Sequence, residues 1–295
     1  MTHHPEEHAR FPEISAVVCT YTEERWDLLS AAITSLQRQE QPLKEIIVVA
    51  DHNESLLNRL RSIPGVVAVP NDGEQGLSGA RNSGVAAATG SVVASLDDDA
   101  EAARDWSARL REDFLHPAVA GVGCSVEPYW EKGKPEWFPE EFYWVVGCTY
   151  RGVPTRRKLI RNPLGAAMAI RRDVFENVGG FRSGLGRLNK TPLGCEETEL
   201  CVRARQHDPG SIFIQDPAAR ASHYVPEDRA RWRYFRSRCF AEGLSKAAVA
   251  RSVGSADGLA SERAYVTRVL PSGVWNGLRR ALRGDLWGVA QAGAI

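Results

Sequence analysis

The sequence predicts an α/β fold with a mostly parallel central sheet flanked by helices. Two observations predict it. Through the first 100 residues, apolar runs of strand length alternate with helical stretches of roughly ten residues, which is typical of βαβ units. The run Ser91–Leu96 has the β-branched content of a strand buried on both faces, and three carboxylates, Asp97–Asp99, follow it. Because open α/β sheets bind ligands at the carboxyl edge of their strands, a site is expected there.

Composition limits the possible classes of protein. The 295 residues, 43% hydrophobic and 25% charged, suit one large globular α/β domain. A net charge of zero argues against a nucleic-acid binder, and no stretch reaches the roughly 18 apolar residues of a membrane span. Six scattered cysteines without a CxxC pair favour reduced thiols in a cytoplasmic protein and argue against zinc. The polar start of the chain, residues 1–11, is expected to be a flexible tail.

In the first third of the chain, polar groups follow the predicted strands. Strands are expected at Ile14–Cys19, Glu45–Ala50, Val66–Val69 and Ser91–Leu96, and helices at Leu28–Leu36, Leu56–Leu60 and Gly76–Ala88. Thr20 and Tyr21 follow the first strand, Asp51 follows the second, and Asp97 and Asp99 lie at the end of the last. The carboxyl ends of parallel strands meet at one edge, so these side chains are expected to face one crevice.

After Asp99 the regular alternation stops. The expected elements are a helix at Trp106–Leu115, strands at Val119–Val126 and Ala166–Arg171, a helix at Val174–Val178, a mobile loop at Gly184–Gly194, a helix at Glu196–Arg205, strands at Ile212–Gln215 and Ala219–His223, and a basic helix at Arg229–Phe240. An aromatic and charged segment spans Glu127–Arg161, and the last forty-odd residues have an amphipathic helical pattern.

Two further features indicate a phosphate and a cation. Gly76–Asn82 opens a helix with glycines and supplies Arg81, and a helix N-terminus with an arginine suits a phosphate group. Adjacent acids at a strand end are stable when they hold a hard divalent cation. Together with the polar strand ends, these features describe a nucleotide-diphosphate pocket with a metal.

The ordered set of motifs resembles family 2 glycosyltransferases of the inverting GT-A type. The matching segments are Val17–Tyr21, Ile46–Asp51, Gly76–Gly84, Ser95–Ala100, Asn162–Arg172, Gly179–Phe181 and Gly194–Cys201. The resemblance implies a single GT-A domain at 12–243, with a nucleotide-binding half at 12–100 and an acceptor half at 101–243. A helical C-terminal extension at 244–295 would follow it.

The resemblance also implies roles on the nucleotide side. Thr20, Tyr21 and Asp51 would hold the base, and Arg81 would lie near the base or the diphosphate. Asp97 matches the first acid of the DxD motif and would contact the ribose or a metal-bound water.

The metal would be Mg²⁺ or Mn²⁺. Asp99, the last acid of the DxD motif, would bind it on the diphosphate, with Asp97 beside it. His223 matches the position of a C-terminal histidine that completes the metal site in related enzymes.

Glu196-Glu197 falls where the family carries an acid pair whose second member is the catalytic base. Glu197 takes that place, where aspartate is commoner, so the assignment between Glu196 and Glu197 stays open. Without the upstream motifs, these acids would simply favour a helix N-terminus. Trp137 and Trp144 are either an acceptor wall, because aromatic faces stack on sugars, or core. Their segment, Trp137–Tyr150, is similar to transferases that extend polyprenyl-phosphate-linked sugars, including uronosyl transferases of archaeal surface glycosylation.

The resulting hypothesis is a metal-dependent inverting glycosyltransferase. It would move a sugar from a nucleotide-sugar, UDP-sugar preferred over GDP or dTDP, to a glycan, a lipid-linked sugar or a small natural product. A sugar-phosphate nucleotidyltransferase is one alternative, but this chain lacks the Gly-rich loop that such enzymes usually carry after the first strand. A non-catalytic nucleotide-sugar-binding protein is the other. The basic C-terminal helices are either a solvated face or a peripheral contact with the inner face of the membrane.

Overall fold

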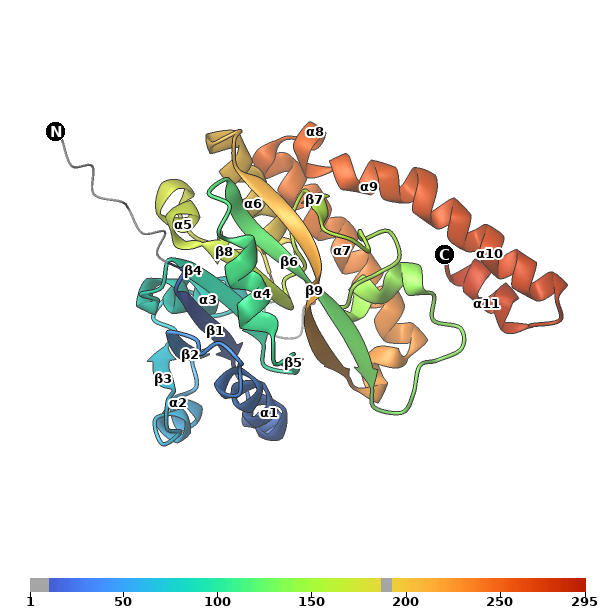
Figure 1. The fold of residues 1–295 in the computed structure, drawn as a ribbon. Helices are drawn as coiled ribbons and strands as arrows, with labels where there is room; N and C mark the ends of the chain where they lie inside the picture. Colours follow the sequence, from blue (N-terminus) through green and yellow to red (C-terminus); the bar gives the residue numbers. More distant parts are fainter. Residues whose placement is uncertain (1–10, 187–192) are drawn as a thin grey trace.

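A single curled sheet organises the chain, with helices on both of its faces (Figure 1). The computed structural model describes residues 11–186 and 193–295. Within them nine strands form the sheet, in the order β3-β2-β1-β4-β8-β6-β9-β5, and β7 pairs with β9. The predicted tail, residues 1–11, lies outside the described residues except for Phe11. Residues 187–192 of the loop predicted to be mobile also lie outside them.

The first half is the predicted parallel sheet. Its strands are β1 (Ile14–Thr20), β2 (Glu45–Ala50), β3 (Val67–Pro70) and β4 (Val92–Asp97), and β1 runs parallel to both β2 and β4. Alternate side chains of β1 belong to different core clusters: Ala16 and Val18 to one, Val17 to the other. Both faces of β1 are therefore buried, and so are both faces of β4, as predicted for the run Ser91–Leu96.

The helices divide between these two clusters. On one face pack α1 (Trp26–Gln37), α2 (Glu54–Leu60) and α4 (Trp106–Asp113). On the other pack α3 (Leu77–Ala87), α5 (Arg172–Val178) and α6 (Glu196–His207). Asn53 caps α2 because its Oδ1 accepts a hydrogen bond from Leu56 N at 2.9 Å. The two-sided arrangement leaves the strand ends free to form a site.

The second half of the sheet is mixed in direction. β8 (Ala167–Arg171) runs antiparallel to both β4 and β6 (Val119–Trp130), while β6 is parallel to β9 (Ile212–Val225). The two strands predicted at 212–215 and 219–223 are one strand. Its register against β6 shifts after Asp216, next to Pro217, which has no N–H for the ladder. The short strands β5 (Ala100–Ala102) and β7 (Lys158–Ile160) both pair with β9.

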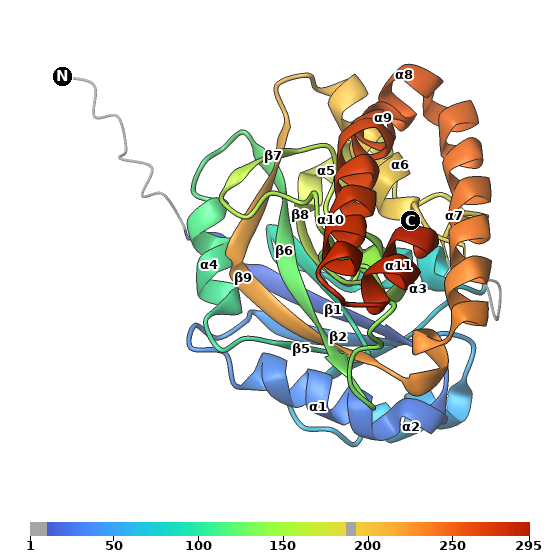
Figure 2. The same cartoon turned by 90° about the vertical axis from the view of Figure 1, so that its right-hand side faces the viewer.

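After β9 the chain is helical, as the sequence predicted. Its elements are α7 (Trp232–Val253), α8 (Ser255–Gly258), α9 (Ala260–Ala264), the π-helical turn η4 (Tyr265–Val269), α10 (Leu270–Leu282) and α11 (Trp287–Ala294). The basic helix starts at Trp232, because η3 (Glu227–Ala230) forms a separate 3₁₀ turn. Two other 3₁₀ segments are η1 (Glu23–Arg25) and η2 (Glu140–Val146). Figure 2 shows α7 and the α9–α10 run as two columns, with α11 folded back on α10.

Candidate functional site

One large cavity of about 1240 Å³ collects most of the polar residues singled out in the sequence. It opens at the carboxyl ends of β1, β2 and β4, and extends past the start of α6 to the C-terminal helices. Its lining includes Thr20, Tyr21, Asp51, Arg81, Asp97, Asp99, Trp144, Glu196, Glu197 and His223. The acids at residues 97–99 and 196–197, separated by about a third of the chain, therefore share one cleft.

Asp51 is fixed at the end of β2 by two hydrogen bonds. Asn71 Nδ2 donates to its Oδ1 at 2.6 Å, and Gly76 N donates to its Oδ2 at 2.9 Å. The second bond ties Asp51 to the start of α3, where Gly76 has a φ of 124° that favours glycine. Thr20 is buried beside it and Tyr21 is half exposed. This wall offers a carboxylate, a hydroxyl and an aromatic face to a ligand.

Arg81 joins the two acidic groups. It is buried on α3, and its Nη1 donates to Glu196 Oε1 at 2.5 Å while its Nη2 donates to Gly165 O at 2.8 Å and lies 3.5 Å from Asp97 Oδ1. The Arg81 guanidinium thus contacts both Asp97, at the end of β4, and Glu196, at the start of α6. Arg81 lines the cavity and also forms an ion pair with Glu196. It therefore has a structural role, and its predicted place near the base or the diphosphate stays a prediction.

Asp97, Asp99 and His223 form a potential metal-binding group. Their ligand atoms all lie within 4.8 Å of one another, and His223 Nε2 is 3.0 Å from Asp99 Oδ1. Strand pairing creates this proximity, because Ala100 in β5 lies opposite His223 in β9 and Tyr224 N donates to Asp99 O at 2.8 Å. Two carboxylate oxygens and one imidazole nitrogen are a donor set that fits a divalent cation such as Mn²⁺ or Mg²⁺.

Two arginines face the same acids. Arg25 Nη1 lies 2.9 Å from Asp98 Oδ1 and 3.1 Å from Asp99 Oδ2, and Arg229 Nη2 lies 3.3 Å from Asp99 Oδ2. Burial alone would raise the pKa of Asp99, but His223 and then the two arginines hold it well below its ordinary value. Both arginines line the cavity, so they place positive charge next to the DxD acids.

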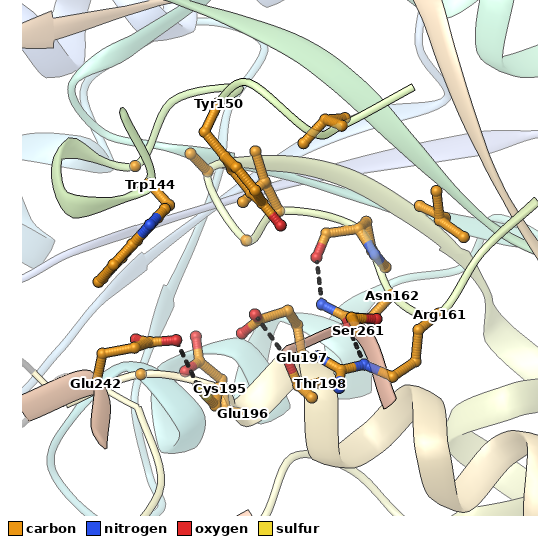
Figure 3. Close-up of a pocket in the computed structure, with 18 of the residues that line it drawn as sticks. Trp144, Tyr150, Arg161, Asn162, Cys195, Glu196, Glu197, Thr198, Glu242 and Ser261 are labelled. Atoms are coloured by element: carbon orange, nitrogen blue, oxygen red, sulfur yellow. Dashed lines mark hydrogen bonds between the residues drawn. The ribbon is translucent and has the colours of Figure 1, made fainter. Parts of the chain in front are cut away.

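Glu197 differs from Glu196 in its surroundings. Glu196 is ion-paired to Arg81, whereas the Glu197 carboxylate points into the open part of the cavity and accepts a hydrogen bond from Thr198 Oγ1 at 3.2 Å (Figure 3). Burial and the charge of Glu196 raise the pKa of Glu197 to about 7, although Lys246 opposes the shift. A carboxylate with a pKa near neutral is suited to general-base catalysis. Of the two acids, Glu196 is held in an ion pair with Arg81, and Glu197 forms no ion pair within residues 11–186 and 193–295.

The two predicted acceptor tryptophans lie in different places. Trp144 lines the cavity, and its Nε1 donates to Tyr265 Oη at 3.1 Å. Trp137 is not among the lining residues. It packs edge-on against Trp232 and Phe235, with ring centroids 5.1 and 5.4 Å apart. The structure therefore brings Trp144 to the site and places Trp137 in an aromatic cluster behind it.

A partly buried ionic network beside Glu197 carried no motif in the sequence. Arg161 makes a bidentate contact with Glu262 at 2.6 and 2.8 Å, and Lys246 Nζ bridges Glu262 at 2.7 Å and Glu242 at 3.3 Å. Arg238 completes the network at 2.7 Å from Glu242 Oε2. It joins the segment before β8 to α7 and α9. Sequence reasoning missed it because its members are scattered over 100 residues and meet only through tertiary packing.

Comparisons with known proteins show which sequences and structures this chain is similar to. The family model for "Glycosyl transferase family 2" matches residues 15–179. A glucosyl-dolichyl phosphate glucuronosyltransferase of Haloferax volcanii is 36% identical over 239 residues, which cover 79% of this chain and 76% of that protein. The succinoglycan biosynthesis protein ExoM of Rhizobium meliloti is 27% identical over 236 residues, covering 77% of this chain and 71% of ExoM.

Two solved structures share the fold. A structure of GalNAc-T7 with UDP, GalNAc and Mn²⁺ matches with a TM-score of 0.56 and 20% identity, covering 73% of this chain and 44% of that one. The mannosyltransferase PcManGT from Pyrobaculum calidifontis, in complex with GDP-Man and Mn²⁺, matches with a TM-score of 0.53 and 19% identity, covering 96% of this chain and 86% of that one. At this identity the likeness speaks for the fold alone, and the fold is GT-A.

Proposed function

Because the chain belongs to glycosyltransferase family 2, we propose that it transfers a sugar from a nucleotide-sugar to a hydroxyl of a lipid-linked sugar in one inverting displacement. The observation that carries this proposal is the link made by Arg81. It joins the Asp97 end of the potential metal-binding group to Glu196, the neighbour of Glu197. A cation, a leaving diphosphate and a general base would then meet in one cleft.

The donor is proposed to be UDP-bound. Thr20, Tyr21 and Asp51 offer the hydroxyl, aromatic face and carboxylate that a uracil and ribose need. The matched GalNAc-T7 structure holds UDP, whereas the matched mannosyltransferase holds GDP-Man. UDP-glucuronic acid is the first donor to test, because the Haloferax relative is named a glucuronosyltransferase.

Asp97, Asp99 and His223 would hold Mg²⁺ or Mn²⁺, which when bound would offset the charge on the departing diphosphate. Glu197 accepts the proton of the acceptor hydroxyl as that oxygen forms its bond to the anomeric carbon. The bond from the anomeric carbon to the phosphate oxygen breaks, and the nucleoside diphosphate leaves with the electron pair. Arg25 and Arg229 lie on the side where that charge collects, and Arg81 keeps Glu196 in place.

The acceptor is proposed to be a polyprenyl-phosphate-linked sugar. The Haloferax relative is named for a glucosyl-dolichyl phosphate acceptor. In this chain, Trp144, Tyr150 and Tyr265 line the cavity on the side of Glu197, and Figure 3 shows Trp144 and Tyr150 above the Glu196-Glu197 pair. Aromatic faces of this kind stack on sugar rings and pack against lipid chains.

The test separates transfer from donor binding. Transfer from UDP-glucuronic acid to a glucosyl-phosphopolyprenol is measured with Mn²⁺, together with UDP affinity by calorimetry. Glu197→Gln is expected to lose at least about 100-fold in kcat, the usual contribution of a general base, and to keep its UDP affinity. Asp99→Asn is expected to lose the Mn²⁺-dependent part of UDP binding.

Glu227→Gln is the matched control, since Glu227 is half exposed and pairs with Arg231 on the surface. Full transfer activity in Glu197→Gln would refute the base assignment. Mn²⁺-independent UDP binding in the wild type would refute the metal assignment. Release of pyrophosphate from UTP and a sugar phosphate would instead favour a nucleotidyltransferase.

A further inference from the structure

The hairpin formed by α10 and α11 exposes an apolar stripe. Trp275, Leu278 and Leu282 recur at positions i, i+3 and i+7 of α10 and share one face of the helix. Leu282 is 86% exposed, and Leu286 in the following turn is 82% exposed. Trp287 at the start of α11 is half exposed. Isolated apolar residues are normal on a surface, but several large exposed apolar side chains on one hairpin indicate a binding surface.

The stripe is not needed to hold the hairpin together. The opposite face of α10 packs on α11 through glycines: a Cβ added at Gly277 would lie 2.7 Å from Gly288 O. In the turn, Asp285 accepts hydrogen bonds from Arg280 Nε at 2.7 Å and from Trp287 N at 3.0 Å. The hairpin is therefore closed by backbone contact and polar bonds, and Leu278, Leu282 and Leu286 are left on the outside.

The charge of the hairpin is positive. Residues 270–295 contain three arginines, Arg279, Arg280 and Arg283, against one acid, Asp285. Arg280 pairs with Asp285 at 2.5 Å, and Arg279 lies over the ring of Trp275 at 5.0 Å. Within residues 11–186 and 193–295, neither Arg279 nor Arg283 forms an ion pair with an acid. Exposed leucines and tryptophans flanked by free arginines are complementary to an anionic lipid surface.

The hairpin also lies next to the cavity. Tyr265, Val269 and Leu270 line the cavity and lead directly into α10. Figure 1 shows the α10–α11 turn projecting from the molecule at the end away from β1, β2 and β3. The turn follows the other end of α10, about 20 Å along the helix from Leu270, so one helix connects a surface that held the turn with the cavity. No described helix is long and apolar enough to cross a bilayer, so such a contact would have to be interfacial.

We propose that the α10–α11 hairpin docks on an anionic lipid bilayer, with Leu282 and Leu286 at the acyl boundary and Arg279 and Arg283 at lipid phosphates. This inference rests on the proposed function, because docking would bring the enzyme to a lipid-linked acceptor. The docking itself requires neither donor nor acceptor.

The test is co-sedimentation of the full chain with vesicles, without nucleotide-sugar. Vesicles of phosphatidylcholine with phosphatidylglycerol are compared with phosphatidylcholine alone. The wild type is expected to bind the anionic vesicles and to be released by salt. Leu282→Gln/Leu286→Gln should weaken binding by about tenfold or more through lost apolar burial, and Arg279→Gln/Arg283→Gln by about thirtyfold through lost attraction. Leu115→Gln, at a half-exposed leucine after α4, is the matched control and should bind as the wild type.

Circular dichroism and UDP affinity establish that each variant is folded. Equal binding to neutral and anionic vesicles, or unchanged binding in both double variants, would overturn the proposal. So would a wild-type dimer in sedimentation velocity that Leu282→Gln/Leu286→Gln converts to a monomer, because the stripe would then be covered by a second copy. Since no catalytic step is measured, an inactive enzyme that still binds vesicles would refute the proposed function and leave the docking intact.

Discussion

At the scale of single residues, the ionisation of Glu197 is the feature with the clearest kinetic consequence. Burial beside Glu196 raises its pKa to about 7, so the carboxyl group is neutral below that pH and cannot take a proton. We expect kcat/KM for transfer to fall about tenfold per pH unit below pH 7 and to level off above it. A profile measured from pH 5.5 to 8.5 at saturating Mn²⁺ checks this. A flat profile over that range would contradict it.

The same shift has a consequence for stability. Because the folded state raises the pKa of Glu197 from its ordinary 4.5 to about 7, the stability that this group contributes is present below pH 4.5 and is lost as the pH rises through 7. Glu197→Gln has no carboxyl group to ionise at this position. Its unfolding free energy relative to that of the wild type should therefore be up to about 3 kcal/mol larger at pH 8 than at pH 4.5. Urea unfolding at both pH values measures it. Glu227→Gln should gain nothing.

Arg81 is the residue on which both halves of the site depend. Its guanidinium and Glu196 are both buried and 2.5 Å apart. Arg81→Met keeps the bulk of the side chain but leaves Glu196 buried without its partner, which should cost about 3–5 kcal/mol of unfolding free energy at pH 7. Chemical unfolding measures the cost. Arg231→Met, which removes an exposed surface pair with Glu227, should leave stability unchanged. A cost no larger than that of Arg231→Met would contradict this prediction.

How far these residues could be predicted depends on what brings them together. Thr20, Asp51, Asp97 and Asp99 follow from strand ends, because parallel strands share an edge. His223 needed the resemblance to a family, since its place next to Asp99 is created by the pairing of β5 with β9, and a three-residue strand leaves no pattern. Arg25, Glu242 and Glu262 needed the structure, because no local pattern marks an ion pair between distant segments.

At the scale of elements, the close packing of α3 on the sheet makes a prediction about Gly84. A Cβ at this position would collide with Val17 Cγ1 and lie 3.2 Å from Val49 Cγ2, both on stiff β-branched side chains of β1 and β2. Gly84→Ala should therefore destabilise the fold by about 1–3 kcal/mol, even though alanine is the better helix former. Thermal unfolding measures it.

Gly243 in α7 is the matched control for Gly84. It is also a helical glycine, but an added Cβ would meet nothing within 4 Å. Gly243→Ala should stabilise the protein by about 0.5–1 kcal/mol. Opposite signs for the two variants are expected, and the same sign for both would show that α3 is not held this closely to β1.

The elements also show why one half of the fold was easier to predict. From β1 to β4, three of the four strands, β1, β2 and β4, are buried on both faces, and each helix lies between strands in sequence, so local patterns and order suffice. The sequence predicted two strands in place of β9, because Pro217 interrupts its ladder. It predicted no strand at β7, which lies in the aromatic and charged segment Glu127–Arg161. Both pair with partners that are distant in sequence, so only the tertiary fold defines them.

At the scale of the whole molecule, the cavity is built from two parts of the chain, to which the proposed function gives separate tasks. In that proposal, the carboxyl ends of β1, β2 and β4 bind the nucleotide. The other side of the cavity, where the acceptor is proposed to bind, is lined by α7 and by the segment from α9 to α10. The Arg161–Glu262 ion pair and the hydrogen bond from Tyr265 to Glu141 O hold this segment in place. Donor affinity and acceptor affinity should therefore respond to different substitutions.

Tyr265→Phe tests this division. The Tyr265 hydroxyl donates to Glu141 O at 2.8 Å and accepts from Trp144 Nε1 at 3.1 Å. Removing it leaves the Trp144 indole and the Glu141 carbonyl without this partner, at a cost of about 1–3 kcal/mol, and frees Trp144 to move. We expect KM for the lipid-linked acceptor to rise about tenfold while UDP affinity stays within about twofold of the wild type, as measured by steady-state kinetics and calorimetry. Tyr129→Phe, at an exposed tyrosine on β6, should change neither. Equal losses for donor and acceptor would show that the C-terminal helices act on the whole cavity and not on its acceptor side.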